Sequence, residues 1–142
     1  MLGLTVYHHI SRTDWSISSY KRIAYLDTPE KFWRFINNLP VVYNGMIAIM
    51  VEDIAPVWED PKNSAGGTCT TMLNNRTYHR TIEDILARLV TGELTDTSIS
   101  FTGVTISRKR NDWALKLWSA APVDKNVVFK SMITAASYAP HH

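Results

Sequence analysis

Short runs of β-branched and aromatic residues recur along this chain, and most of them are joined by brief turns. Strand-like runs cover 2–10, 20–26, 46–51, 68–73, 99–107 and 113–119. Short, hairpin-like connections favour antiparallel pairing, because parallel strands need long crossovers. We therefore expect one antiparallel sheet.

Three stretches between these runs carry apolar residues at helical spacing. The first begins after Thr28, which can cap a helix and is followed by Pro29, a residue suited to the first helical position. The second is capped by Thr81 and ends at Gly92, and the third is capped by Asp124. This pattern predicts an α+β fold with about three helices packed on the convex face of the sheet and a ligand pocket on its concave side.

The composition limits what the chain can bind. Its 142 residues suffice for a single domain over 1–142, and its net charge of +2 provides no global basic field. Cys69 is the only cysteine, which excludes an internal disulfide and fits a reducing compartment. We expect a monomer in the cytoplasm, and also in the nucleus, with no membrane span or signal peptide.

Motifs of catalysis are missing from the sequence. There is no nucleophile motif, no metal-spaced set of His, Cys and Asp, and no Gly-x-Gly-x-x-Gly loop. We therefore expect a binding protein without a metal or cofactor, not an enzyme.

The segment 56–67 follows an apolar run and is polar, bracketed by prolines and ended by two glycines, so it is typical of a loop. Trp58 and Glu59 stand side by side on it. A lone loop tryptophan most often covers the core of its own domain. Here a second tryptophan, Trp15, lies on the loop between the first two strands, and we interpret the pair as one pocket.

Basic residues gather near the last predicted hairpin. Its tip, 108–112, carries three consecutive cations. The strand that follows places Lys116 and Trp118 on the face opposite its leucines. Such a tip is usually only a solvated turn, but beside a lysine and an outward tryptophan it is a candidate anion site.

These residues match the chemistry of a flat, cationic base such as 7-methylguanine. Two aromatic rings can sandwich the cation, each stack contributing roughly 1–3 kcal/mol. A carboxylate accepts hydrogen bonds from the base, and arginines or lysines hold its phosphates. The candidates are Trp15 and Trp58 for the sandwich, Glu59 for the base edge, Arg108, Arg110 and Lys116 for the phosphates, and Trp118 for the methyl group.

A third tryptophan has two interpretations. Trp33 lies about 100° around the first helix from Phe32, at the edge of the apolar stripe or outside it. It either folds back over the rim of the core or anchors a partner protein.

The chain resembles the cap-binding translation initiation factor 4E family over about residues 5–135. The resemblance is carried by Trp15 before a strand, by Asp-Thr-Pro-Glu-Lys-Phe-Trp at 27–33, by Pro-Val-Trp-Glu-Asp at 56–60, by Gly66-Gly67, and by Trp118-Ser119. It implies a curved antiparallel sheet with helices on its convex back and the messenger RNA cap held on the concave side.

The resemblance also implies roles for single residues. Trp15 and Trp58 match the stacking pair and Glu59 matches the guanine-reading carboxylate. Trp118 matches the residue near the methyl group, and Arg108 and Arg110 match phosphate contacts. Trp33 matches the tryptophan that receives a helical motif of a factor 4G-like scaffold or a 4E-binding repressor. The implied function is recognition of the 7-methylguanosine cap in translation initiation or its regulation.

Several departures mark a short, divergent member. Thr68 stands where the family usually has an arginine, and losing that contact would cost roughly 1–3 kcal/mol. Lys116 can substitute for a displaced lysine, whereas Asp84 and Arg88 fall near positions of exposed partner-binding leucines. The family's last strand is expected to be missing.

Two alternatives to cap binding stay open at this point. One is a partner-binding or decoy protein with a weakened cap pocket. The other is a general single-strand RNA binder, against which the modest net charge argues.

Overall fold

The computed structural model describes residues 2–38, 45–74, 76–96, 99–124, 129 and 137–141. They build a seven-stranded sheet in the order β2-β1-β3-β5-β6-β4-β7, and every neighbouring pair is antiparallel. The strands are β1 (Leu4–His9), β2 (Tyr20–Leu26), β3 (Met46–Val51), β4 (Gly67–Asn74), β5 (Phe101–Lys109), β6 (Asp112–Ser119) and β7 (Ser137–Pro140).

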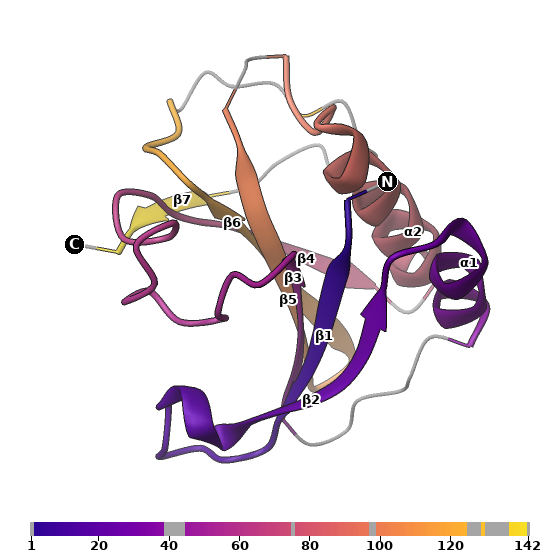
Figure 1. The fold of residues 1–142 in the computed structure, drawn as a ribbon, viewed down its shortest axis with the longest axis horizontal. Coiled ribbons are helices and arrows are strands. Elements are labelled where there is room, and N and C mark those ends of the chain that lie inside the picture. Colours follow the sequence, from indigo (N-terminus) through magenta and orange to yellow (C-terminus); the bar gives the residue numbers. More distant parts are fainter. Residues whose placement is uncertain are drawn as a thin grey trace.

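Two α-helices lie on one side of this curved sheet, as Figure 1 shows. They are α1 (Pro29–Asn37) and α2 (Tyr78–Thr91), and a short 3-10 turn, η1 (Ile17–Ser19), precedes β2. The predicted α+β class and curved antiparallel sheet are thus confirmed. The predicted third helix, after Asp124, falls largely outside the described residues. Neither helix in the described part of the chain is long and apolar enough to cross a membrane.

The core fills the space between the sheet and the helices. Each central strand sends alternate side chains into it, as the period of two along a strand requires. Its buried members include Leu4, Val6, Ile47, Ile49, Val104, Ile106, Leu115 and Leu117 from the strands and Phe32, Ile36, Ile82, Ile85, Leu86 and Leu89 from the helices. The opposite face of the sheet therefore remains available to a ligand.

The first helix begins as predicted, but the second begins earlier. The side chain of Thr28 accepts a hydrogen bond from the Lys31 amide at 3.2 Å. Thr81 is not a cap: it is buried inside α2, which starts at Tyr78. The Tyr78 ring stacks on Trp113 with centroids 4.3 Å apart, and this tertiary contact explains the additional helical turn.

One strand of the sheet is not among those predicted from the sequence. β7 pairs with the edge of β4, and Gly67 lies opposite Pro140. A Cβ on Gly67 would overlap the carbonyl oxygen of Ala139, so close pairing here requires glycine. Ser-Tyr-Ala-Pro is a weak strand signal, because proline is tolerated only at edges such as this one.

Candidate functional site

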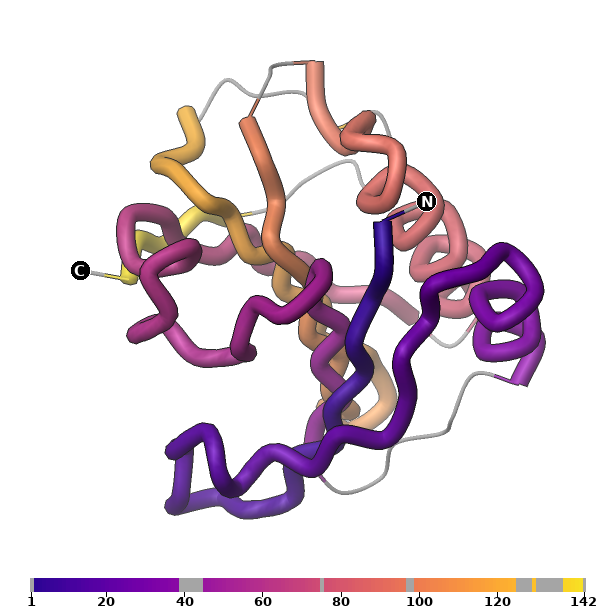
Figure 2. Tube along the Cα trace, in the orientation of Figure 1, coloured from indigo at the N-terminus to yellow at the C-terminus, as the bar shows by residue number. Residues whose placement is uncertain are grey.

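A cleft of about 1180 Å³ opens on the side of the sheet away from the helices. Its walls are the loop between β1 and β2 and the loop between β3 and β4, which Figure 2 shows in indigo and magenta projecting on the same side. All seven residues predicted to hold a cap line this cleft: Trp15, Trp58, Glu59, Arg108, Arg110, Lys116 and Trp118. The structure therefore brings together side chains from three separate parts of the chain.

The first wall presents Trp15 on a loop stabilised by its own hydrogen bonds. Ser11 Oγ accepts from the amide of Asp14 at 2.9 Å, and Asp14 Oδ1 accepts from the amide and hydroxyl of Ser16 at 3.0 and 2.6 Å. These hydrogen bonds from Ser16 hold the pKa of Asp14 below its usual range. The Trp15 side chain is 54% exposed, so much of its surface is open to solvent.

The second wall presents Trp58 and Glu59 on a loop built around Asn63. Asn63 is fully buried, and its Nδ2 donates to the carbonyl oxygens of Ala55 and Val57, each at 2.9 Å. Its Oδ1 accepts from the Thr102 hydroxyl of β5 at 2.5 Å. The loop is thus tied to the sheet, while Trp58 remains 46% exposed.

Electrostatics connect the two walls. Burial raises the pKa of Tyr20, and the charge of Glu59 raises it further. The Glu59 carboxylate therefore lies within electrostatic reach of the phenol of Tyr20, the first residue of β2. An exposed carboxylate in the same cleft as two tryptophans is suited to accept hydrogen bonds from a cationic ring.

The floor of the cleft comes from β6. Lys116 is exposed and Trp118 is half-buried, whereas Leu115 and Leu117 are fully buried on the core face, as the alternation predicts. The ring of Trp118 lies 5.0 Å from that of His141, just after β7. The indole Nε1 of Trp118 is buried without a hydrogen-bond partner among the described residues.

Positive charge dominates the lining. Five cations and two carboxylates line the cleft: Arg12, Arg108, Lys109, Arg110 and Lys116, with Glu59 and Asp112. This balance favours an anionic ligand such as a phosphate chain. No group of His, Cys, Asp and Glu able to hold a metal ion occurs within the described residues.

The predicted phosphate ligands are not equivalent. The guanidinium of Arg108 lies 5.0 Å from the Trp113 ring centroid, and its Nε donates to the Arg110 carbonyl oxygen at 3.0 Å. Lys116 extends from the middle of the sheet, between Thr70 of β4 and Thr105 of β5. Thr68 does not line the cleft; it pairs with Trp118 across β4 and β6.

Trp33 lies on α1, one of the helices on the side of the sheet shown in Figure 1, and it does not line the cleft. It is 45% exposed and meets Phe32 edge-on with centroids 5.2 Å apart. On α2, Arg88 Nε and Asp84 Oδ1 form an ion pair at 3.1 Å, one helical turn apart. The positions near the family's partner-binding leucines are therefore engaged with each other.

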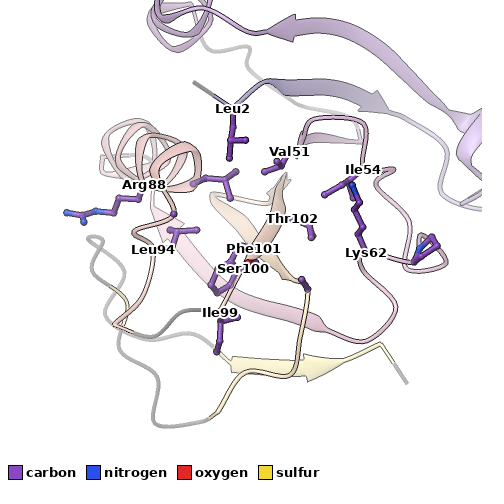
Figure 3. Close-up of a pocket in the computed structure, with 14 residues that line it drawn as sticks. Leu2, Val51, Ile54, Lys62, Arg88, Leu94, Ile99, Ser100, Phe101 and Thr102 are labelled. Carbon is purple, nitrogen blue, oxygen red and sulfur yellow. The ribbon is translucent and has the colours of Figure 1, made fainter.

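A second cavity, of about 450 Å³, lies beside the C-terminal end of α2 and the start of β5. Its lining is mostly apolar, with Val51, Ile54, Leu94 and Phe101 among the residues labelled in Figure 3. The Arg88 side chain points away from it (Figure 3). None of the predicted ligand-binding residues lines this cavity, so it is separate from the cleft.

The sequence analysis assigned no role in the ligand site to three residues near the cleft: His9, Arg12 and His141. Arg12 stands three residues before Trp15 in the same loop, and that proximity was an available signal. His9 lies in the first predicted strand, 2–10, where no motif marks it, and it is buried. His141 comes near Trp118 only through the pairing of β7, which no local pattern indicates.

The comparisons with known proteins agree on one family. Residues 5–135 match the family model described as Eukaryotic initiation factor 4E. Eukaryotic translation initiation factor 4E of Dictyostelium discoideum is 26% identical over 115 residues, which are 77% of this chain and 45% of that protein. Eukaryotic translation initiation factor NCBP of Oryza sativa subsp. japonica is 31% identical over 112 residues, which are 76% of this chain and 49% of that protein.

Solved structures show the same fold. The structure of C. elegans eIF4E-3 with the 4E-binding protein Mextli and a cap analog has a TM-score of 0.72 and 17% identity, covering 85% of this chain and 73% of that one. The chain spans about half the length of the curated relatives it matches.

Proposed function

We propose that this chain, which belongs to the eukaryotic initiation factor 4E family, binds the 7-methylguanosine cap of messenger RNA in the cleft between its two tryptophan loops. The family is one of translation initiation factors, not of enzymes. The observation that carries the proposal is the gathering of two exposed tryptophans, two carboxylates and five cations in one cleft.

Each part of the cap has a matching group in this proposal. The methylated base is a delocalised cation that stacks between Trp15 and Trp58, while Glu59 accepts hydrogen bonds from its N–H groups. Trp118 faces the methyl group. Lys116 and the cations of the hairpin tip, Arg108 and Arg110 among them, hold the phosphates.

A protein partner is proposed for the opposite side of the molecule. Exposed Trp33 on α1 is a suitable anchor for a helical motif of a 4E-binding protein or a factor 4G-like scaffold. The solved structure of C. elegans eIF4E-3 holds a 4E-binding protein together with a cap analog. We further propose that the chain acts as a cytoplasmic monomer in translation initiation or its regulation.

One observation favours a second candidate function. Thr68 replaces an arginine common in the family and cannot supply a charge to the cleft. A chain whose pocket has lost affinity in this way would act through Trp33 as a partner-binding or decoy protein.

Tryptophan fluorescence during titration with 7-methyl-GTP, with GTP as the reference ligand, separates these candidates. Cap binding predicts strong quenching by the methylated nucleotide and little by GTP. Trp58→Ala and Glu59→Ala should each weaken binding of 7-methyl-GTP roughly 10- to 100-fold without unfolding the domain. Asp53→Ala is the matched control, because it removes an exposed carboxylate of the same loop outside the cleft.

The opposite results are equally informative. Equal, weak responses to both nucleotides would refute cap binding and favour the partner-binding function. Full affinity in Trp58→Ala or Glu59→Ala would show that the base binds elsewhere.

A further inference from the structure

His9, the last residue of β1, lies directly against one of the two proposed base-stacking tryptophans. Its ring stacks on Trp15 with centroids 4.4 Å apart and an interplanar angle of 25°. On another side it meets Tyr20, with centroids 4.3 Å apart. His9 is only 1% exposed, so the Trp15 side chain shields it from solvent.

The same imidazole also fixes the backbone beside Trp15. His9 Nε2 donates to the carbonyl oxygen of Asp14 at 2.7 Å. One side chain thus contacts the indole ring and holds the peptide unit immediately before it. The neighbouring His8 points to the other face of β1 and is only half-buried, so the arrangement is particular to His9.

We propose that His9 is a positioning residue for the base stack: it holds Trp15 in place, and its charge sets how well Trp15 binds a cationic base. This inference rests on the proposed cap-binding function. In this proposal His9 acts through Trp15, because its ring stacks on the indole and is only 1% exposed.

The physical basis is the charge change of an imidazole. Histidine is the side chain that normally changes charge between pH 5 and 8. A protonated His9 would place a cation on one face of an indole whose other face attracts a cationic base through its negative quadrupole. Two cations on opposite faces of one ring repel each other, so acidification should weaken binding of the methylated base more than binding of neutral guanine.

Several charged or titratable groups surround His9. Asp14 and Arg12 come from its own loop, Tyr20 from β2, and Glu59 acts on Tyr20 from the opposite wall. Met46, its neighbour on β3, is not titratable. Because the Ser16 hydrogen bonds hold the pKa of Asp14 low, this carboxylate stays ionised over the pH range of the test.

The test compares the affinities for 7-methyl-GTP and GTP between pH 7.5 and 5.5. Taking the ratio of the two affinities cancels the titration of the phosphates, which both nucleotides share, and comparison with the His9 variants cancels the titration of the methylated base itself. Relative to His9→Phe and His9→Gln, the unmodified chain should lose roughly two- to five-fold of its preference for 7-methyl-GTP on acidification. His8→Phe should behave like the unmodified chain. His9→Gln also keeps a donor for the Asp14 carbonyl, in case the phenylalanine variant folds poorly.

A ligand-free measurement separates this inference from the proposed function. A protonated imidazole quenches an indole that it contacts, so intrinsic fluorescence should drop on acidification. His9→Phe and Trp15→Phe should each remove this drop. If the chain fails to distinguish 7-methyl-GTP from GTP but keeps the His9-dependent quenching, cap binding is refuted and the pairing of His9 with Trp15 stands. If the affinity ratio shows the same pH dependence with and without His9, the positioning role is refuted.

Discussion

Lys116 is the cation of the cleft whose position the sheet defines best. It lies on β6 between two threonines of β4 and β5, so its backbone is held on both sides. Arg108, by contrast, packs over Trp113 and bonds to a neighbouring carbonyl oxygen. At the scale of single residues, phosphate binding should therefore depend on Lys116 more than on Arg108.

Lys116→Met keeps the length of the side chain and removes its charge. We expect roughly tenfold or greater loss of affinity for 7-methyl-GTP, as for a hydrogen bond to a charged group, but little change for 7-methylguanosine, which has no phosphates. Isothermal titration calorimetry with both ligands measures the difference. Lys62→Met, an exposed lysine outside the cleft, is the control. Equal losses for both ligands would show that Lys116 contacts the nucleoside instead.

Cys69 reports on folding because it is the only cysteine and is buried in the core. Burial raises the pKa of its thiol to about 11. Since the thiolate is the nucleophile, we expect iodoacetamide to leave the native chain unmodified at pH 8 and to alkylate it in urea. Alkylation at equal rates in both conditions would contradict the burial of this thiol.

The same pKa shift makes the free energy of unfolding depend on pH in the alkaline range. The unfolded thiol ionises near pH 8.5 and the folded one near 11, so the folded state loses stability as the pH rises between these values. The loss should be on the order of 2 kcal/mol from pH 7.5 to 10.5. In urea unfolding, Cys69→Ala should lose correspondingly less free energy of unfolding between pH 7.5 and 10.5 than the unmodified chain.

At the scale of elements, the loop between β3 and β4 depends on one buried amide. Asn63 donates to two carbonyl oxygens of the loop and accepts from Thr102 on β5. In addition, Asp60 Oδ2 accepts a hydrogen bond from the amide of Ala55 at 2.9 Å. The exposed Trp58 is thus carried by a loop with a polar core of its own.

Asn63→Ala should therefore damage both stability and binding. Leaving the carbonyl oxygens of Ala55 and Val57 without their donor should lower the free energy of unfolding by about 1–3 kcal/mol. Affinity for 7-methyl-GTP should fall as well, because Trp58 and Glu59 lose their support. Chemical denaturation and fluorescence titration measure the two effects. Thr102→Val removes only one of the three hydrogen bonds of Asn63, so both effects should be smaller. A larger loss in Thr102→Val than in Asn63→Ala would show that the bond to β5 contributes most to holding the loop.

The elements also show what the sequence could and could not predict. Periodicity and capping located six strands and the start of α1, because those signals are local. The early start of α2 depends on Tyr78 stacking against distant Trp113, and β7 depends on the open edge of β4. The cleft residues were found from residue type and resemblance, but His9 was missed because its burial arises only when Trp15 folds over it.

At the scale of the whole molecule, the sheet separates two surfaces. The helices lie on one face of the sheet (Figure 1), and exposed Trp33 belongs to α1. The cleft is lined by the two tryptophan loops and by β5 and β6, and no residue of α1 or α2 lines it. The packed strands between them belong to one continuous core, so a ligand on one side does not touch residues of the other. The two proposed binding activities should therefore be separable by mutation.

Trp33→Ala tests this separation. Trp33 is 45% exposed and does not line the cleft, so its loss should leave the affinity for 7-methyl-GTP unchanged within about twofold and reduce stability by less than about 1 kcal/mol. Binding of a helical peptide of the 4E-binding class should drop at least tenfold, as for an aromatic anchor at an interface. Trp58→Ala should give the reverse pattern, with cap affinity lost and peptide affinity kept. A folded Trp33→Ala variant that loses cap binding would mean that the two faces are energetically coupled through the sheet.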